Sequence, residues 1–366
     1  MNRSMRLGVI GCGEVTESWH LPALQRVRDA EVAAVADIDP NRLAHVADRF
    51  HIQQRYTNFR ALLEAPEIEA VAVCVPAAFH VEVALAALDA EKHLFIEKPL
   101  ALSLDDSDRL IERAKRSSRK VMVGFNLRWH RLVRRARTVL RRGALGPLES
   151  VRTILSSGRC GEGLAEWRKR RAQGGGVLLE VAVHHFDLWR FLLEADVEEV
   201  FASSRSEQSD DETAVVAARM AGGLLAVSLF SWRGEDANEL EIHGRAGRLR
   251  VSCYRFDGFD WLATSRGSGG ARARLVGLAR TLTEVPRAAL EARHGGVFAD
   301  SYRAQWQHFI ESVQRDAPVG CTLEDGRRAL EVALAAAESA ALGRPSSVRH
   351  APRTVALIAP AAHRPS

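Results

Sequence analysis

Short apolar runs alternate with amphipathic helical patterns along the first third of the chain. The runs are rich in Val and Ile and do not alternate strictly between apolar and polar positions, which is typical of strands buried on both faces of a parallel sheet. Helix start signals lie between them: Asp39 precedes Pro40, and Ser103 lies three residues before Asp106. The pattern predicts an α/β domain with a doubly wound parallel sheet over residues 1–125. Its expected strands are residues 6–10, 31–36, 70–75, 93–96 and 121–123.

A different pattern begins after residue 125. An apolar stripe among many arginines over residues 128–142 predicts a basic amphipathic helix. Several strand-like runs then follow one another without a helix between them, which favours a mostly antiparallel sheet, and later helices would cover one face of it. We therefore expect a second, α+β domain over residues 126–350. Its expected strands are 148–155, 197–203, 213–219, 224–231, 239–243 and 249–253, and its expected helices 175–193, 301–314 and 323–341.

Two segments stand apart from this alternation. Residues 264–296 contain six arginines and a Gly-Ser-Gly-Gly run near their start. We interpret them as an insertion-like excursion between a strand and a helix. Residues 351–366 are rich in Pro and Ala, and we expect them to form a peripheral tail.

The composition narrows the class of protein. The 366 residues are 46% hydrophobic and 27% charged, which fits a folded chain of about two domains. The net charge of +5 is mildly basic, and the Arg-rich helical faces lack interleaved aromatics, so we expect no nucleic-acid partner. Five scattered cysteines without a CxxC pair exclude a zinc ribbon or a disulfide framework and fit a reducing compartment. The apolar run near residue 1 is too short for a signal peptide, and the sequence has no apolar run of ~20 residues, so we expect a cytoplasmic protein without a membrane segment.

A glycine-rich turn follows the first expected strand. Gly11-Cys12-Gly13-Glu14-Val15-Thr16 is a G-x-G-x-x-G fingerprint with Thr at the third glycine. In such a turn Gly11 permits the tight bend, and Gly13 lets the backbone approach a pyrophosphate at a helix N-terminus. An ordinary glycine turn is the alternative.

An acidic residue at the end of the second expected strand strengthens the dinucleotide interpretation. Asp37 lies 24 residues after Gly13, where a carboxylate can accept both ribose hydroxyls of an adenosine. The same carboxylate would repel a 2′-phosphate, so the sequence favours NAD over NADP, although Arg42 could relax that preference. A role for Asp37 in capping the next turn is the alternative, but Asp39 is available for that role.

Two further groups of residues could carry chemistry. Glu97-Lys98-Pro99 follows a strand at its carboxyl end, where ligands bind in open α/β sheets, and a lysine there can exchange a proton. Pro99 could make a cis bond, and a surface Glu-Lys pair is the alternative.

The second group follows three glycines at residues 174–176. On a continuous helix Glu180, His184 and Asp187 would share one face, with His185 about 100° away. A satisfied core histidine is the alternative. We expect no metal, because there is no HExxH pattern and no third ligand at a suitable spacing.

Together these motifs resemble the Gfo/Idh/MocA family of NAD(P)-dependent oxidoreductases, which includes glucose–fructose oxidoreductase and inositol dehydrogenase. The matching segments occur in family order from about Arg6 to Val348. The resemblance implies a Rossmann domain, then a domain with an open sheet, and a cofactor and substrate cleft between them. It also implies a homodimer or homotetramer. The segments are GVIGCGEV, ADIDPNR, AVCVPAAFH, HLFIEKPL, VGFNLRW, AEWR, GGGVLLEVAVHHFD and the closing PVGCTLEDGRRALEVALAAAESAALGRP.

The resemblance also implies roles for individual residues. Lys98 matches the catalytic lysine, His184 the catalytic histidine and Glu180 its partner, which is Asp in inositol-dehydrogenase-like members. Ala182 stands where the family usually has Gly, and both departures affect the expected substrate geometry. The expected cofactor-binding residues are Gly11, Gly13, Glu14, Val15, Asp37, Arg42, Pro76, His80, Glu97, Lys98, Trp167 and Arg168. The expected substrate-binding residues are Lys98, Asn126, Arg128, Glu180 and His184.

The function implied is an NAD-dependent dehydrogenase acting on a secondary alcohol of a sugar, polyol or sugar derivative. Lys98 and His184 would hold the hydroxyl and exchange its proton, with Glu180 tuning His184. One alternative is an NAD-dependent glycoside-cleaving enzyme of the same family. Another is a non-catalytic dinucleotide-sensing regulator, and the intact Glu-Lys-Pro motif favours an enzyme over that.

Overall fold

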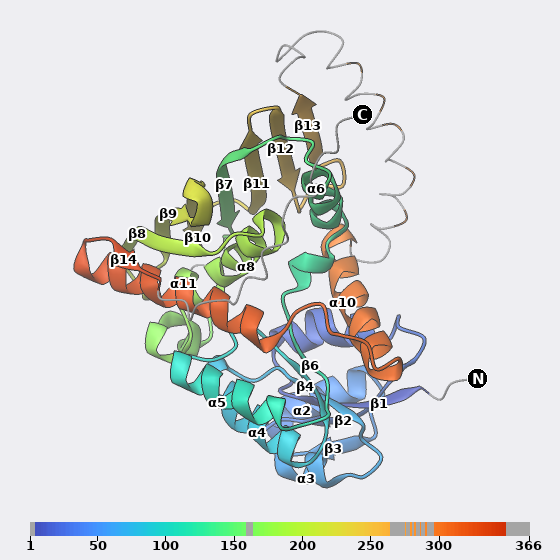
Figure 1. Cartoon of the computed structure of the whole chain (residues 1–366). Coiled ribbons are helices and arrows are strands. Elements are labelled where there is room, and N and C mark those ends of the chain that lie inside the picture. Colours follow the sequence, from blue (N-terminus) through green and yellow to red (C-terminus); the bar gives the residue numbers. More distant parts are fainter. Residues whose placement is uncertain are drawn as a thin grey trace.

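Two β-sheets form the framework, one in each half of the molecule (Figure 1). The computed structural model describes residues 4–158, 164–263 and 296–348, together with positions 275, 279, 282, 286 and 290. The expected excursion at 264–296, except its isolated described positions, and the expected tail at 351–366 lie outside the described residues.

The first sheet has six parallel strands in the order β3-β2-β1-β4-β5-β6. The predicted doubly wound α/β domain is therefore confirmed. Strand β3 was not predicted, because its residues form no apolar run: Gln54 and Tyr56 are half-buried and Arg55 is exposed. The strand order reverses between β1 and β4, the point at which such folds bind ligands. The strands are β1 (Met5–Ile10), β2 (Ala30–Ala36), β3 (Gln54–Tyr56), β4 (Ala70–Val73), β5 (His93–Ile96) and β6 (Val121–Val123).

Helices cover both faces of this sheet. The predicted start signals are confirmed: Asp39 accepts hydrogen bonds from two backbone N–H groups of α2, and Ser103 accepts one from α5. The helical elements are the π-helical turn η1 (Thr16–His20), α1 (Leu21–Leu24), α2 (Pro40–Arg49), α3 (Phe59–Glu64), η2 (Ala77–Phe79), α4 (His80–Asp89) and α5 (Leu104–Lys115).

The second sheet has eight strands in the order β13-β12-β11-β7-β10-β9-β8-β14. All neighbours are antiparallel except β10 and β7. Buried and exposed residues alternate along β8, β9 and β10, so one face is covered and the other is open, as expected. The short edge strands β13 and β14 were not predicted. The strands are β7 (Leu148–Ser156), β8 (Val197–Arg205), β9 (Thr213–Met220), β10 (Leu225–Ser231), β11 (Ala237–Gly244), β12 (Gly247–Ser252), β13 (Phe259–Ala263) and β14 (Ser346–Ser347).

Two predicted helices of this half differ in the structure. The basic helix starts only at Arg131, where the side chain of His130 caps it, and the preceding residues form a separate 3-10 turn. The helix expected over 175–193 is interrupted at Val181, so Glu180 and His184 belong to different helices. The elements are η3 (Asn126–Trp129), α6 (Arg131–Arg141), η4 (Glu166–Lys169), η5 (Arg171–Gln173), α7 (Val177–Glu180), α8 (Ala182–Leu193) and η6 (Ala221–Gly223).

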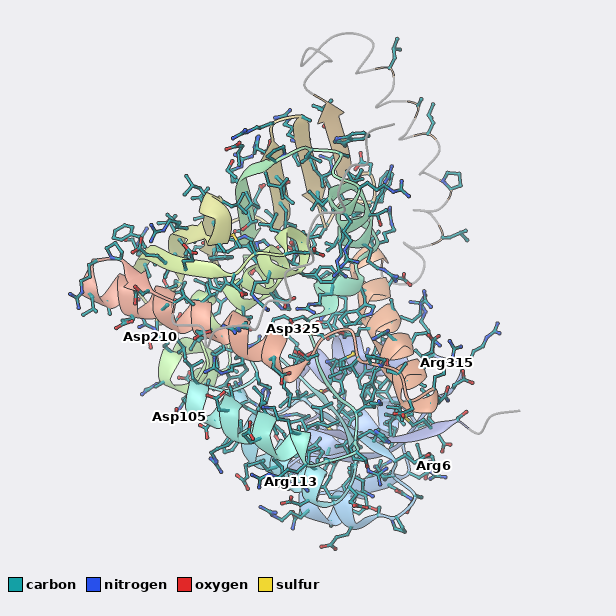
Figure 2. The ribbon with its side chains drawn as sticks, viewed as in Figure 1. Arg6, Asp105, Arg113, Asp210, Arg315 and Asp325 are labelled. Carbon is teal, nitrogen blue, oxygen red and sulfur yellow. The ribbon has the colours of Figure 1, made fainter. Side chains whose placement is uncertain are left out.

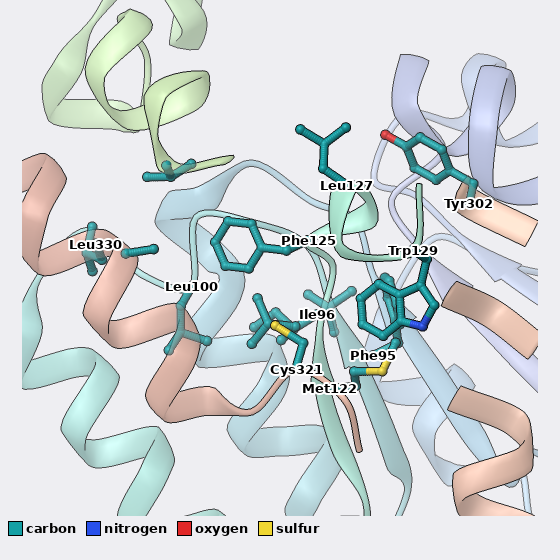
Figure 3. Packing of buried hydrophobic residues seen from close by; sticks show 14 of the residues in the cluster. Phe95, Ile96, Leu100, Met122, Phe125, Leu127, Trp129, Tyr302, Cys321 and Leu330 are labelled. Atoms are coloured by element: carbon teal, nitrogen blue, oxygen red, sulfur yellow. The ribbon is translucent and has the colours of Figure 1, made fainter. Parts of the chain in front are cut away.

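The last long helices join the two halves. Helix α11 (Leu323–Leu342) packs on β8 and α8 but also touches α5. Helix α10 (Gly296–Gln314) was expected to cover the second sheet, and that expectation is wrong: its main contacts are with η1, α1 and η3 (Figure 1). The reason is aromatic packing, because Trp306 stacks on Phe95 of β5 with ring centroids 4.2 Å apart. Figure 3 shows the resulting shared core, with Leu330 and Leu100 on one side of Phe125 and Trp129 and Tyr302 on the other.

Candidate active site

The glycine-rich loop at the end of β1 is shaped to receive a ligand. Gly11 has φ 99°, and a Cβ there would lie 2.5 Å from the carbonyl oxygen of Cys74, so only glycine fits. A Cβ on Gly13 would meet nothing within 4 Å, which leaves open space beside the loop. Thr16 replaces the third glycine without disturbing the turn, because its hydroxyl donates to the carbonyl of Gly11 at 2.6 Å.

Asp37 lies against this loop at the end of β2. Its carboxylate accepts the backbone N–H of Cys12 at 2.7 Å and that of Asp39 at 2.9 Å. Arg42 lies beside it, with Nη1 3.7 Å from Asp37 Oδ2, but Arg42 also binds Asp39 at 3.2 Å. The loop, the open space beside Gly13 and this fixed carboxylate fit the diphosphate and ribose of a dinucleotide.

Lys98 connects the two halves of the molecule. It follows β5, and its Nζ donates to the backbone carbonyl of Glu180 at 2.9 Å. Its backbone N–H donates to Glu97 Oε2 at 3.1 Å, and the Lys98–Pro99 bond is cis. The lysine therefore extends from the carboxyl edge of the parallel sheet to the last residue of α7.

His184 and Glu180 contribute polar atoms that the described residues leave unpartnered. Nδ1 of His184 and Oε2 of Glu180 are both buried without a hydrogen bond among the described residues. Burial, with smaller effects of Lys98 and His185, lowers the pKa of His184 well below its usual value, so its imidazole is neutral. The expected orientation of His184 by Glu180 is absent from the described contacts, because the break at Val181 separates their helices.

His185 and Asp187 point into the protein instead. His185 is fully buried, and its Nε2 lies 3.1 Å from Asn238 Oδ1. Asp187 was expected to share the face of His184, but it forms a buried ion pair with Arg128, whose Nε donates to it at 2.8 Å. The same guanidinium binds Asp325 at 3.0 Å, and Figure 2 shows Asp325 where α11 begins, between the two sheets. The contacts of Arg128 are those of a structural ion pair, and its substrate role stays a prediction.

Arg168 links the glycine-rich loop to the lysine side of the cleft. Its Nη1 donates to Glu14 Oε2 at 2.9 Å, and its Nε lies 3.2 Å from Glu180 Oε1. The three glycines explain how this loop comes so close: a Cβ on Gly175 would lie 2.0 Å from the carbonyl oxygen of Arg168. The ring of Trp167 lies beside the guanidinium, 5.3 Å from its carbon. No pattern in the sequence predicted this bridge between Glu14 and Glu180.

The remaining predicted residues border the same region. His80 is buried, with Nδ1 2.8 Å from the carbonyl of Pro99 and Nε2 2.9 Å from that of Val75, so it joins the loops that follow β4 and β5. Pro76 lies directly before η2. Asn126 donates to Ser301 at 2.9 Å, while its buried Oδ1 has no partner among the described residues. Within the described residues, no group of three or more His, Cys, Asp or Glu could hold a metal.

Comparisons with known proteins match both halves of the chain. The family model described as "Oxidoreductase family, NAD-binding Rossmann fold" matches residues 5–125, and "GFO/IDH/MocA C-terminal domain" matches residues 133–250. The chain belongs to the GFO/IDH/MocA oxidoreductase family. It is accordingly an NAD-dependent oxidoreductase, and the resemblance inferred from the sequence is confirmed.

Individual family members resemble the chain over nearly its whole length. Myo-inositol 2-dehydrogenase of Thermotoga maritima is 31% identical over 345 residues, which are 92% of this chain and 96% of that protein. A crystal structure of a probable dehydrogenase from Thermotoga maritima is 27% identical, with a TM-score of 0.76 over 94% of this chain and 99% of that one. Levoglucosan dehydrogenase in complex with NADH is 20% identical and shares the fold, with a TM-score of 0.80 over 95% of this chain and 100% of that one. Across the described part of the chain, no helix is both long and apolar enough to cross a membrane.

Proposed function

We propose that this family member transfers a hydride between NAD and a secondary alcohol of a sugar or polyol. The observation that carries the proposal is that Lys98 Nζ donates to the backbone carbonyl of Glu180, while Glu180 Oε2 and His184 Nδ1 are buried without a partner among the described residues. Lys98 is close enough to His184 to lower its pKa, so the three residues form one polar group. A polyhydroxylated substrate offers both donors and acceptors to such a set. The similarity to a myo-inositol 2-dehydrogenase over 92% of the chain supports the same substrate class.

The residues of the chain divide the chemistry between them. Bound NAD would supply the acceptor, or in the reverse direction the donor, of the hydride at the carbinol carbon. Lys98 donates a hydrogen bond to the reacting oxygen, and the neutral imidazole of His184 takes the hydroxyl proton as the carbonyl forms. Oε2 of Glu180 accepts a hydrogen bond from a neighbouring hydroxyl. In the reverse direction His184 returns the proton.

The proposed cofactor site uses the glycine-rich loop and its surroundings. Gly11, Gly13, Glu14 and Val15 would present the helix N-terminus to the pyrophosphate. Asp37 would accept the adenosine ribose hydroxyls, with Arg42 beside it. The proposed nicotinamide side is formed by Pro76, His80, Glu97, Lys98, Trp167 and Arg168.

A turnover screen tests the function. Polyols, sugars and sugar nucleotides are each incubated with NAD or NADP while the absorbance of the reduced cofactor is followed. Sustained formation of NADH with a polyol or sugar supports the proposal. Cleavage of a glycoside without net NADH would instead indicate the glycoside-cleaving alternative, and NAD binding without any turnover would indicate a sensing regulator.

We also propose that the protein is a homodimer or homotetramer formed through the open face of the second sheet. Apolar side chains that are 37–58% exposed line this face on three adjacent strands. Register places Val227 beside Ala217 and Leu229 beside Val215, so the apolar residues are contiguous. They are Phe201, Val215, Leu225, Val227 and Leu229. The cytoplasmic location and the absence of a nucleic-acid partner stay predictions.

A further inference from the structure

A buried chain of hydrogen bonds leads from α10 to the backbone of Lys98. The indole Nε1 of Trp306 donates to Nδ1 of His20 at 3.0 Å. Nε2 of His20 lies 2.9 Å from Glu97 Oε1, and Glu97 Oε2 accepts the backbone N–H of Lys98 at 3.1 Å. Trp306 and His20 are 0% exposed and Glu97 is 6% exposed, so no water competes for these bonds.

The hydrogen bonds of this chain have a defined direction. An indole N–H can only donate, so Nδ1 of His20 keeps its lone pair and Nε2 carries the hydrogen that binds Glu97. Burial acts to lower the pKa of His20, whereas Cys74 and Glu97 raise it to about 10. A protonated His20 would, however, point an N–H at the indole N–H, so the 3.0 Å contact requires the neutral form. Glu97 then accepts on both oxygens, as only a carboxylate can.

Aromatic rings and a glycine enclose this chain of hydrogen bonds. The rings of Phe95 and Tyr302 lie edge-on to His20, with centroids 5.5 Å and 5.2 Å away. On the other side of the carboxylate, a Cβ on Gly124 would lie 2.8 Å from Glu97 Oε1. Neither His20 nor Glu97 can turn without opening the core. The chain of hydrogen bonds therefore positions the backbone N–H of Lys98 from helix α10. The residue of α10 that begins this chain, Trp306, lies 286 residues after His20 in the sequence.

We propose that Trp306, His20 and Glu97 are positioning residues that hold Lys98 in the geometry needed for hydride transfer. The inference rests on the proposed function of Lys98. A displacement of a reacting group by about 1 Å can cost ~10²-fold in turnover. Loss of the hydrogen bonds that position Lys98 is therefore expected to lower kcat more than it weakens the binding of substrate or NAD. NAD is expected to bind through the glycine-rich loop and Asp37, which the chain of hydrogen bonds does not touch.

The first test compares two substitutions of His20. His20→Gln can accept from the indole and donate to Glu97, as the neutral imidazole does, but it carries no charge. His20→Leu can do neither. We expect kcat to fall ~10–100-fold in His20→Leu and less than about threefold in His20→Gln, while KM and the Kd for NAD change by less than about twofold in both. If His20→Gln is as slow as His20→Leu, a charged His20 is required and the proposal is wrong.

Trp306→Phe provides a second test that keeps the aromatic stack. It removes the indole N–H together with one of the two fused rings, and we expect kcat to fall ~3–10-fold. Trp189→Phe is the matched control, because Trp189 is also buried but its Nε1 has no partner among the described residues. Unchanged kcat in Trp306→Phe, an equal loss in Trp189→Phe, or a parallel loss of NAD affinity would each overturn the proposal. This variant also decides the matter if His20→Leu fails to fold.

Hydrogen exchange separates this inference from the proposed function. The backbone N–H of Lys98 is protected by Glu97, so its exchange is expected to speed up in His20→Leu and Trp306→Phe but not in Trp189→Phe. If the wild-type protein turns over no polyol or sugar, the proposed function is wrong. The exchange measurement would still test whether Trp306, His20 and Glu97 position the backbone of Lys98. Unchanged exchange in both variants would contradict the inference even in an active enzyme.

Discussion

Lys98 reaches from the half that carries the glycine-rich loop to the half that carries His184, through its bond to the carbonyl of Glu180. Lys98→Met keeps the length of the side chain but removes its charge and its protons. We expect kcat to fall ~10²–10⁴-fold, with NAD affinity and the melting temperature nearly unchanged. Lys115→Met, at an exposed lysine paired with Glu112, is the control. Near-normal turnover in Lys98→Met would exclude the mechanism.

His184 and His185 are adjacent but are expected to respond differently to substitution. His184→Asn should lower kcat strongly, because we propose that the neutral imidazole takes the hydroxyl proton. His185→Asn should mainly lower the melting temperature, since His185 is fully buried against Asn238. The comparison is made by steady-state kinetics and thermal unfolding, and the reverse ranking would contradict the assignment.

The low pKa of His184 also fixes the direction of a pH effect. A base stays active while it is unprotonated, and the pKa of His184 is lowered by burial. In the direction of alcohol oxidation, kcat should therefore not decline as the pH falls through about 6.5, the usual value for histidine. A pH profile at saturating NAD and substrate measures this.

Asp37 should determine the choice between NAD and NADP. Asp37→Ser removes the carboxylate that we propose faces the adenosine ribose. We expect the affinity for NAD to fall ~10-fold and the preference for NAD over NADP to narrow. Asp39→Ser is a matched control, because Asp39 caps α2 and serine is an equally good cap. Calorimetric titration of NAD and NADP tests this. Equal affinities of the wild-type protein for the two cofactors would show that the charge of Arg42 outweighs that of Asp37.

Among these residues, the sequence located those that follow a recognisable local pattern. The glycine-rich loop, Asp37, Lys98 and His184 all lie at an expected distance from a strand or a glycine run. Trp306 and the bridge made by Arg168 could not be predicted, because their partners are distant in sequence and are chosen by packing. His20 lies four residues after Thr16 in the helical turn η1, about one turn away from it. This spacing was the signal in the sequence that could have placed His20 beside the predicted site.

At the scale of elements, the glycines before α7 set how closely the Arg168 loop approaches. In Gly175→Ala the new Cβ would lie 2.0 Å from a backbone oxygen of that loop, so the loop must move and Arg168 with it. We expect a lower melting temperature and a Kd for NAD raised several-fold. Gly158→Ala is the control, since its nearest contact would be an ordinary 3.6 Å. Equal NAD affinity in both variants would show that the loop does not contribute to the cofactor site.

Element boundaries show the same division between what local sequence determines and what packing determines. The caps at Asp39 and Ser103 are local, and both were predicted correctly. The interruption at Val181 has no Pro or Gly at that residue, so a continuous helix was expected. The position of α10 depends on Phe95 stacking with Trp306, which a periodic pattern cannot reveal.

At the scale of the whole molecule, the open face of the second sheet should carry the subunit interface. Val227→Asp introduces a charge at the centre of the apolar face, and we expect the oligomer to dissociate into smaller species. Glu198→Lys, at an exposed position on β8, is the control. Light scattering after size exclusion measures the mass. A mass unchanged in Val227→Asp, or monomeric wild-type protein, would contradict an interface on this face.

The return of α10 to the first sheet has a consequence for biosynthesis. Phe95 is translated about 200 residues before the helix that carries Trp306 and Phe309, which pack on it. At a translation rate of ~5–20 residues per second, roughly 10–40 s pass before α10 is synthesised. Until then the aromatic side chain of Phe95 on the nascent parallel sheet is left uncovered. During that interval it presents a surface suited to chaperones. A chain truncated before α10 would still contain all residues of the first sheet. It would nevertheless lack part of the hydrophobic core that covers this sheet.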